Sequence, residues 1–158
     1  MNHPLFRLPA LVLLAVTFAL TVPALTAQEK ITNKGVKKRV ALMLSAQGAV
    51  TTLTDMMAGR MVFDAGQARA ARRVLVQTSS STSRRFRKPH QDPLSNARSE
   101  IWTYWEEFST HANIAEQAAK QLNVYSINGL RRTLPNVLHS CLSCHERFRV
   151  EPNEFTTH

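Results

Sequence analysis

The sequence contains only two cysteines among its 158 residues, and both fall within one short motif. Because a second cysteine pair is absent, a zinc site built from two separated knuckles lacks its usual ligands. The sequence also lacks a run in which apolar and polar residues alternate, as they do in a β-strand. A thioredoxin-like thiol pair, which lies in a βαβ unit, is therefore not expected. Acidic residues are few, 11 against 20 Lys and Arg, so the formal net charge is +9. Such a charge suits a nucleic-acid partner, but the chain carries no recognition motif for one.

The two cysteines stand three residues apart, and a histidine follows the second, in Cys141-Leu142-Ser143-Cys144-His145. Cys-x-x-Cys-His is the attachment pattern of c-type haem. On a helix, residues three and four apart share a face, so both thiols and the imidazole can converge on one flat ligand. The thiols would form thioethers with the haem vinyl groups, and His145 would be the proximal ligand of the iron. The motif therefore predicts one haem c, bound through Cys141 and Cys144.

Three other interpretations of this motif stay open. A redox-active thiol pair is disfavoured because the strands around such a pair are missing. A zinc site could recruit His139, Cys141, Cys144 and His145, but zinc ligands usually converge from two separated places. The two cysteines could also be plain core residues, which is less expected because both of them fall in this one pattern.

The longest apolar stretch, residues 8–22, follows Arg7 and leads to small residues at Ala24 and Ala27. It is interrupted by Pro and Thr and is short for a membrane span, so a secretory signal peptide is favoured over a retained anchor. We expect residues 1–27 to be the signal peptide, cleaved after Ala24 or Ala27, and residues 28–158 to be one domain. Covalent haem attachment in bacteria takes place outside the cytoplasmic membrane, so the periplasm is the expected location.

Apolar residues at steps of three and four predict four amphipathic helices. The stripe of the first helix, within residues 31–57, is Val36, Val40, Met43, Val50, Leu53 and Met57. Asp64 is the expected N-cap of the second helix, whose stripe is Ala68, Ala71, Leu75 and Thr78. The third stripe is Ile101, Trp105, Phe108, Ala112, Ala115, Ala119 and Leu122. The last helix, capped by Ser126, has the stripe Ile127, Leu130, Leu134, Val137, Cys141, His145 and Phe148.

The segments between these helices are predicted from polar and helix-breaking residues. Gly59 is expected to end the first helix, and Ser95 or Ser99 to cap the third. Residues 79–83 are poor helix material, and the basic, proline-containing residues 84–93 predict an exposed loop. Pro135 predicts that the last helix either bends or restarts with Thr133 as a new cap. Two short turns and one longer middle loop predict an all-α fold, an antiparallel four-helix bundle.

The whole mature chain resembles the class II c-type cytochromes, the family of cytochrome c′ and its low-spin relatives. The resemblance rests on the ending Cys141-x-x-Cys144-His145-x-x-Phe148-Arg149, on the aromatic residues of the third helix, and on Arg39 with Met43 four residues later. It implies a left-handed four-helix bundle that holds one covalent haem between its helices and is often dimeric.

The resemblance leaves open which group faces the sixth coordination position of the iron. Met43 is at the family's distal position, it lies on the inner stripe of the first helix, and a thioether is a competent haem ligand. We therefore predict a periplasmic electron carrier with His145 and Met43 as axial ligands, and no enzymatic activity. The alternative is a five-coordinate cytochrome c′ that binds nitric oxide or another small gas, with Met43 only packed in the core.

Two arginines and the overall charge suggest further contacts. Arg149 lies one turn beyond His145 and Arg39 one turn before Met43, so both could form charge-assisted hydrogen bonds with the haem propionates. The basic charge favours an acidic redox partner protein or a transient contact with an anionic membrane surface. Export and the lack of a recognition motif argue against a nucleic-acid partner. A homodimer through the first two helices is an expectation from the family alone.

Overall fold

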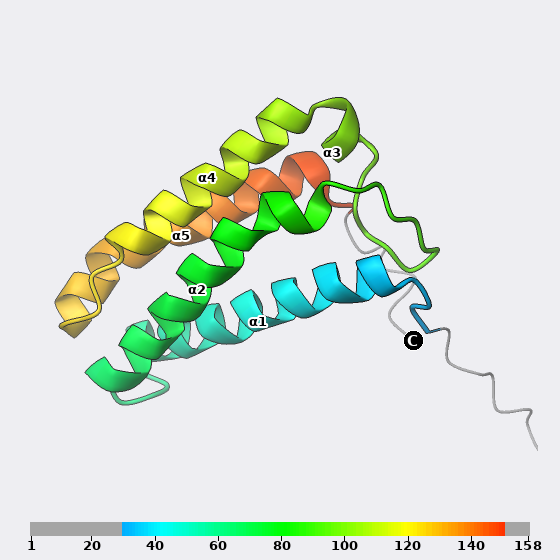
Figure 1. The fold of residues 1–158 in the computed structure, drawn as a ribbon. Helices are drawn as coiled ribbons and strands as arrows, with labels where there is room; N and C mark the ends of the chain where they lie inside the picture. Colours follow the sequence, from blue (N-terminus) through cyan, green and yellow to red (C-terminus); the bar gives the residue numbers. More distant parts are fainter. Residues whose placement is uncertain (1–29, 151–158) are drawn as a thin grey trace, which may run out of the picture.

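The computed structural model describes residues 30–150, which form four long helices and one short one (Figure 1). The helices are α1 (Lys34–Met57), α2 (Ala65–Phe86), α3 (Glu100–Thr103), α4 (Trp105–Gln121) and α5 (Ile127–Phe148). Within residues 30–150 the only β-type pairing is an isolated antiparallel bridge between Ala97 and Arg149. The predicted signal peptide and its cleavage sites lie outside the described residues.

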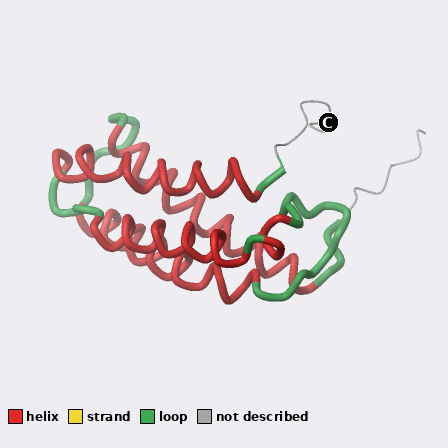
Figure 2. The backbone as a smooth tube through the Cα atoms, turned by 90° about the horizontal axis from the view of Figure 1, so that it is seen from above, coloured by secondary structure: helices red, strands yellow, loops and turns green. Residues whose placement is uncertain are grey.

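The four long helices run alternately up and down and form an elongated bundle (Figures 1 and 2). Around the bundle, α1 packs on α2, α2 on α4 and α4 on α5, while the contact that closes the ring between α5 and α1 is less extensive. The predicted all-α four-helix bundle is confirmed. Because neighbouring helices are antiparallel, the start of α1, the end of α2 and the end of α5 meet at one end of the molecule (Figure 1).

Local signals at the helix ends explain why these helices begin where they do. The side chain of Asp64 accepts a hydrogen bond from the backbone N–H of Gln67, and that of Ser126 accepts one from Gly129, as predicted for N-caps. Asn33 caps α1 in the same way. At the other end of α1, Gly59 has a φ of +75°, a left-handed conformation that only glycine adopts at little cost.

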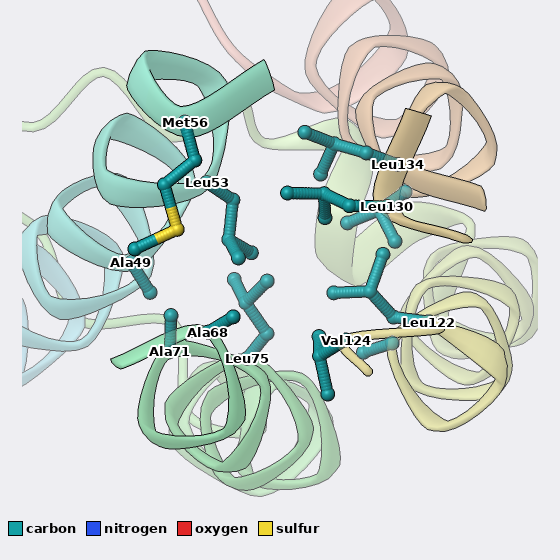
Figure 3. Close-up of a cluster of buried hydrophobic side chains, with 12 residues drawn as sticks. Ala49, Leu53, Met56, Ala68, Ala71, Leu75, Leu122, Val124, Leu130 and Leu134 are labelled. Atoms are coloured by element: carbon teal, nitrogen blue, oxygen red, sulfur yellow. The ribbon is translucent and has the colours of Figure 1, made fainter. Parts of the chain in front are cut away.

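An aliphatic core fills the end of the bundle where α1 ends and α5 begins (Figure 3). Its buried members are Ala49, Leu53, Met56, Ala68, Ala71, Leu75, Ala119, Leu122, Val124, Leu130, Leu134 and Val137. Figure 3 shows Leu53 of α1, Leu75 of α2 and Leu130 of α5 pointing toward one another. The inner stripes predicted from the sequence supply most of these residues, so burial of apolar surface along them accounts for the packing.

The prediction of a loop from residue 84, after a weak helix, is wrong. Helix α2 continues without a break through the polar residues 79–83 to Phe86. The Thr82 hydroxyl, which is buried, donates to the carbonyl of Thr78 one turn earlier, so it is satisfied within the helix. Phe86 itself is buried and anchors the last turn, which shows tertiary packing overriding a low local propensity.

The third predicted helix is divided in two. Tyr104 lies between α3 and α4 with φ −113° and ψ 52°, outside the helical region. Ser99 precedes α3 as expected, but its side chain makes no capping hydrogen bond, and donates instead to the Glu100 carboxylate. Because of this break, α3 and α4 run in different directions. Ile101 of α3 and Phe108 of α4 are both buried in the core.

Pro135 does not divide α5, which runs unbroken from Ile127 to Phe148. The predicted restart at Thr133 is therefore wrong, and the Thr133 hydroxyl donates to the Gly129 carbonyl inside the helix. Proline has no backbone N–H, so the carbonyl of Arg131, four residues earlier, has no donor within the helix. Both Pro135 and Arg131 are exposed, so water can donate to that carbonyl instead.

Among residues 30–150, no helix combines the length and the apolar composition that crossing a membrane requires.

Candidate functional site

A second, aromatic core fills the end of the bundle where α5 ends. Its buried members are Phe86, Ile101, Phe108 and Phe148, from α2, α3, α4 and α5. The ring centroids of Phe86 and Phe148 each lie 5.3 Å from that of Phe108. Five half-buried residues pack against it: Met43, Ala97, Trp102, Trp105 and Cys144. Five aromatic residues thus gather at the end that carries the cysteine motif: Phe86, Trp102, Trp105, Phe108 and Phe148.

The motif residues occupy the last two turns of α5, between the two cores. Cys141 packs against the aliphatic core and Cys144 against the aromatic core. Both thiols are free and only partly buried, and His145 is partly buried as well. As predicted from their spacing, the three side chains lie on the inward stripe of one helix, with buried Val137 before them and buried Phe148 after them.

Burial changes the chemistry of both thiols in the same direction. It raises the pKa of Cys141, and it raises the pKa of Cys144 to about 11, where the nearby Cys141 adds to the effect. A redox-active Cys-x-x-Cys pair needs a thiol whose pKa is lowered. These thiols are neutral near pH 7, so the environment argues against the thiol-exchange interpretation.

The zinc interpretation also lacks the residues it needs. Within residues 30–150, no three His, Cys, Asp or Glu side chains come together in a way that could hold a metal ion. His139 is exposed and borders an open groove between α4 and α5. It therefore lies apart from the inward stripe that carries the cysteines.

The half-buried side chains between α1 and α5 fit a flat apolar group. Met43 on α1 and Cys141, Cys144 and His145 on α5 all keep part of their surface exposed, although they lie at the edges of the two cores. The contact between α1 and α5 is also the least extensive of those between neighbouring long helices. A haem between these two helices would cover the four side chains and complete the packing, and its thioether bonds would use both thiols.

Met43 lies on the α1 side of this region and packs against the aromatic core. The other methionines of α1, Met56 and Met57, belong to or pack against the aliphatic core. This arrangement agrees with the prediction that only Met43 is at the level of the cysteine motif. Its neighbours are apolar rings, with which a thioether makes favourable contacts.

Arg39 is buried, with 2% of its surface exposed. Its guanidinium donates to the backbone carbonyls of Arg85 and His90, at 3.4 and 3.1 Å, and to that of Lys88. It also lies over the Phe86 ring, at 4.9 Å from the centroid. Its nitrogen donors are thus engaged by the protein backbone, and its predicted contact with a haem propionate stays a prediction.

Arg149 lies just beyond α5, and its side chain is exposed. Its backbone N–H donates to the carbonyl of His145 and closes the last turn of the helix. Backbone hydrogen bonds from Arg98 to Phe148, and from Val150 to Asn96, join the end of α5 to the segment before α3. Arg149 is therefore held near the motif, and its predicted propionate contact also stays a prediction.

Phe86 and Trp102 belong to this region, although the sequence did not assign either of them to a site. The Trp102 indole Nε1–H donates to the Phe86 carbonyl at 2.7 Å. Phe86 falls within residues whose basic and polar neighbours predicted an exposed loop. The only signal for Phe86 in the sequence was an apolar side chain within a basic segment. It follows Thr82 by four residues, and the structure shows that both are buried on one face of α2.

A family model described as cytochrome c′ matches residues 34–149. A search of curated proteins gives no match. A nitric oxide complex of a mutant cytochrome c′ from Alcaligenes xylosoxidans is 24% identical, with a TM-score of 0.65, over 74% of this chain and 94% of that one. A mutant cytochrome c′ of Rhodopseudomonas palustris is 19% identical, with a TM-score of 0.69, over 76% of this chain and 100% of that one.

These matches overturn the predicted electron carrier. The family noted above contains low-spin carriers with a methionine ligand as well as cytochrome c′, and the family model that matches this chain is described as cytochrome c′. The prediction that His145 and Met43 together form a six-coordinate electron-transfer centre is therefore wrong. An inward position and a thioether group were insufficient grounds for ligation, because a core methionine shows both features.

The family match spans all five helices and includes Arg39, Met43, Cys141, Cys144, His145 and Arg149. The predicted cofactor is confirmed: the family carries one covalent haem c, and Cys141 and Cys144 are its attachment residues in this chain. The fold, the motif and the match lead to one conclusion. The chain belongs to the cytochrome c′ family, within the class II c-type cytochromes.

Proposed function

We propose that this protein binds a small gas, nitric oxide or carbon monoxide, at the haem iron. The observation that carries the proposal is the environment of Met43, which packs against an aromatic core of Phe86, Ile101, Phe108 and Phe148. This distal side has apolar walls and is held by four different helices. The haem would be held by Cys141, Cys144 and His145, and would supply an iron that can bind a diatomic ligand.

The solved relatives support the choice of ligand. Variants of the Alcaligenes xylosoxidans cytochrome c′ are known in complexes with nitric oxide and, in one case, with carbon monoxide. Both ligands are small and have weak dipoles, so an apolar pocket admits them while it disfavours water and anions. The protein is proposed to bind and release its ligand without converting it, and therefore not to be an enzyme.

Each part of the site has a separate task in this proposal. Cys141 and Cys144 tether the haem to α5, and His145 holds the proximal side of the iron. Met43 fills the distal space without bonding to the iron, and so limits the room for a ligand. The two flanking cores keep bulk water away from both faces, because their buried residues come from all of the long helices.

We also propose that the protein works in the periplasm and meets an acidic partner protein there. The end of the bundle that carries the motif is rich in exposed basic side chains: Lys34, Lys37, Lys38, Arg84, Arg85, Arg87 and Lys88. None of the ion pairs within residues 30–150 includes them. Such a field attracts an anionic surface and speeds encounter with it at low ionic strength.

The absorption spectrum of the purified protein tests the proposed gas binding. We expect high-spin spectra in both oxidation states, and a change to the spectrum of a liganded ferrous haem when nitric oxide or carbon monoxide is added. A low-spin ferrous spectrum that carbon monoxide leaves unchanged would disprove the proposal, because the sixth position would then be taken by a side chain.

A further inference from the structure

Arg39 is a buried cation that no acidic side chain within residues 30–150 pairs with. Its exposed surface is 2%, and none of the three ion pairs in the described part of the chain includes it. A buried charge is costly unless hydrogen bonds replace its water. Backbone carbonyls and two aromatic rings replace that water here, so the surrounding chain is built around this guanidinium.

The carbonyls that Arg39 contacts all belong to the end of α2 and the residues just after it. They are those of Arg85, Lys88 and His90. The last carbonyls of a helix have no partner within the helix. Of these three, the Lys88 carbonyl also accepts a backbone hydrogen bond, from the His90 N–H. One side chain of α1 thus satisfies three backbone groups that lie 46, 49 and 51 residues away along the sequence.

The same guanidinium packs on two aromatic rings of the site. Its Cζ lies 4.9 Å from the ring centroid of Phe86 and 5.0 Å from that of Trp102. Trp102 in turn donates to the Phe86 carbonyl. Arg39, Phe86 and Trp102 therefore form one connected unit that joins α1, the end of α2 and α3.

This unit forms part of the region around Met43. Phe86 belongs to the aromatic core, against which Met43, Trp102 and Cys144 pack. Arg39 and Met43 are four residues apart on α1, so they lie on the same face of the helix, one turn apart. The position of the rings relative to Met43 therefore depends on how closely α1 is held to the end of α2.

We propose that Arg39 is a positioning residue for the distal pocket. It holds the end of α2 against α1, and so places Phe86 and Trp102 as a fixed wall beside Met43. This inference rests on the proposed function, since it assigns the rigidity of the gas pocket to one side chain that does not touch the ligand. Lysine cannot replace Arg39 in full, because an ammonium lacks the planar fork that reaches three carbonyls while it stacks on two rings.

The experiment compares Arg39→Met and Arg39→Lys with Arg72→Met in the haem-loaded protein. Arg72 is a matched control at the other end of the bundle, where its guanidinium donates to the carbonyls of Ala119, at 3.3 Å, and Lys120. Both arginines tie one helix to the end of another, so both Met variants should lower the stability. The measurements are the association rate of carbon monoxide with the ferrous protein, the ferric and ferrous Soret spectra, and the free energy of unfolding.

We expect Arg39→Met to speed carbon monoxide association by about tenfold, equivalent to about 1.4 kcal/mol, and to shift the Soret band. Arg39→Lys should fall between wild type and Arg39→Met. Arg72→Met should lose stability but keep the wild-type rate and spectra. If Arg39→Met and Arg72→Met have the same rates and spectra, Arg39 is only a structural tie and the inference is overturned.

A Trp102→Phe variant keeps the inference testable if the Arg39→Met protein does not fold. It removes the hydrogen bond to Phe86 but keeps the ring and the arginine, so it should reproduce the faster association in part. An unchanged rate in Trp102→Phe would overturn the inference. Failure of the proposed function is a separate result, namely a wild-type protein that does not bind carbon monoxide; the Soret comparison between Arg39→Met and Arg72→Met then decides the inference by itself.

Discussion

For Met43, the sequence predicted the position of the side chain correctly but its role as an iron ligand incorrectly. It packs against the aromatic core on the α1 side of the motif, as its position in the first stripe predicted. A thioether there can either bond to an iron or fill space. The sequence contains the same residue in both cases, and the difference lies in the distance that the helices set between the side chain and the haem.

We predict that Met43→Ala leaves the high-spin spectra unchanged and speeds carbon monoxide association by about tenfold, or about 1.4 kcal/mol. Removing the side chain opens space beside the rings and breaks no bond to the iron. Stopped-flow mixing of the ferrous protein with carbon monoxide measures the rate. Met57→Ala is the control, because Met57 packs against the aliphatic core and should not affect the rate. A slower association in Met43→Ala would contradict this view of the pocket.

At the level of the elements, the last turn of α2 is held in place by residues that are distant in the sequence. Its last turn follows a polar run of weak helix formers, yet it is ordered as far as Phe86. Three groups act on that turn from outside α2: the Arg39 guanidinium, the Trp102 indole and the Phe108 ring. The turn therefore depends on tertiary contacts more than on its own propensity.

We expect Phe86→Ala to cost about 3–5 kcal/mol, as is typical when a buried aromatic residue is truncated. The anchor of the last turn of α2 would be lost, so amide hydrogen exchange should become faster at residues 83–86 than in the rest of α2. Chemical denaturation measures the free energy, and exchange followed by mass spectrometry measures the fraying. Ser80→Ala, at an exposed position of the same helix, should change stability by no more than about 0.5 kcal/mol.

The start of α1 contains one source of pH dependence in the stability of the fold. The Asp92 carboxylate accepts hydrogen bonds from the backbone N–H groups of Thr32 and Asn33, at 2.9 and 3.0 Å. The bond from Asn33 is the main cause of the lowered pKa of Asp92, and those from Thr32 and Leu94 add to it. Because the folded state binds the ionised form, this contribution is present above the unfolded pKa of about 3.9 and is lost as the pH falls through the folded pKa.

The corresponding prediction is that Asp92→Asn is less stable than wild type at pH 7 and that the two converge as the pH is lowered below about 4. Thermal unfolding at a series of pH values measures the difference. Asp64→Asn is the control, because asparagine and aspartate are equivalent N-caps and α2 should keep its start. A difference between Asp92→Asn and wild type that stays constant from pH 7 to pH 3 would show that the carboxylate charge is not involved.

At the scale of the whole molecule, α1 has a long exposed face without charge. Between Arg39 and Asp55 the helix carries no Lys, Arg, Asp or Glu, although the chain as a whole is strongly basic. Leu44 lies on this face with 60% of its surface exposed, beside exposed small residues such as Ala41 and Gly48. Two copies of a basic protein repel each other elsewhere, so this face is where we propose that a homodimer forms.

We predict that Leu44→Glu raises the dissociation constant of this dimer by at least about tenfold. A two-fold axis through the face would bring the two new carboxylates close together, and the exposed apolar contact would be lost. Sedimentation velocity over a range of concentrations measures the change. Ile114→Glu, an equally drastic change at an exposed position of α4, should leave the dimer intact; loss of the dimer in that variant as well would place the interface elsewhere.

Much of the architecture could be predicted from short-range patterns. The caps at Asp64 and Ser126, the turn at Gly59 and the inner stripes of α1, α4 and α5 are each encoded within a few residues. The haem motif is equally local, since two thiols and an imidazole need only one helical turn. These features follow from helix periodicity and capping, which do not depend on the partners that a helix later meets.

The sequence by itself therefore determined the helices, their inward faces and the covalent attachment of haem through Cys141 and Cys144. Only the tertiary structure decided that α2 extends to Phe86, that Tyr104 separates α3 from α4, and that Arg39 is buried among carbonyls far from it in sequence. Each of these depends on which elements lie beside each other. Ligation by Met43 is likewise a matter of helix spacing, because the presence of a thioether in the sequence is the same whether or not it reaches an iron.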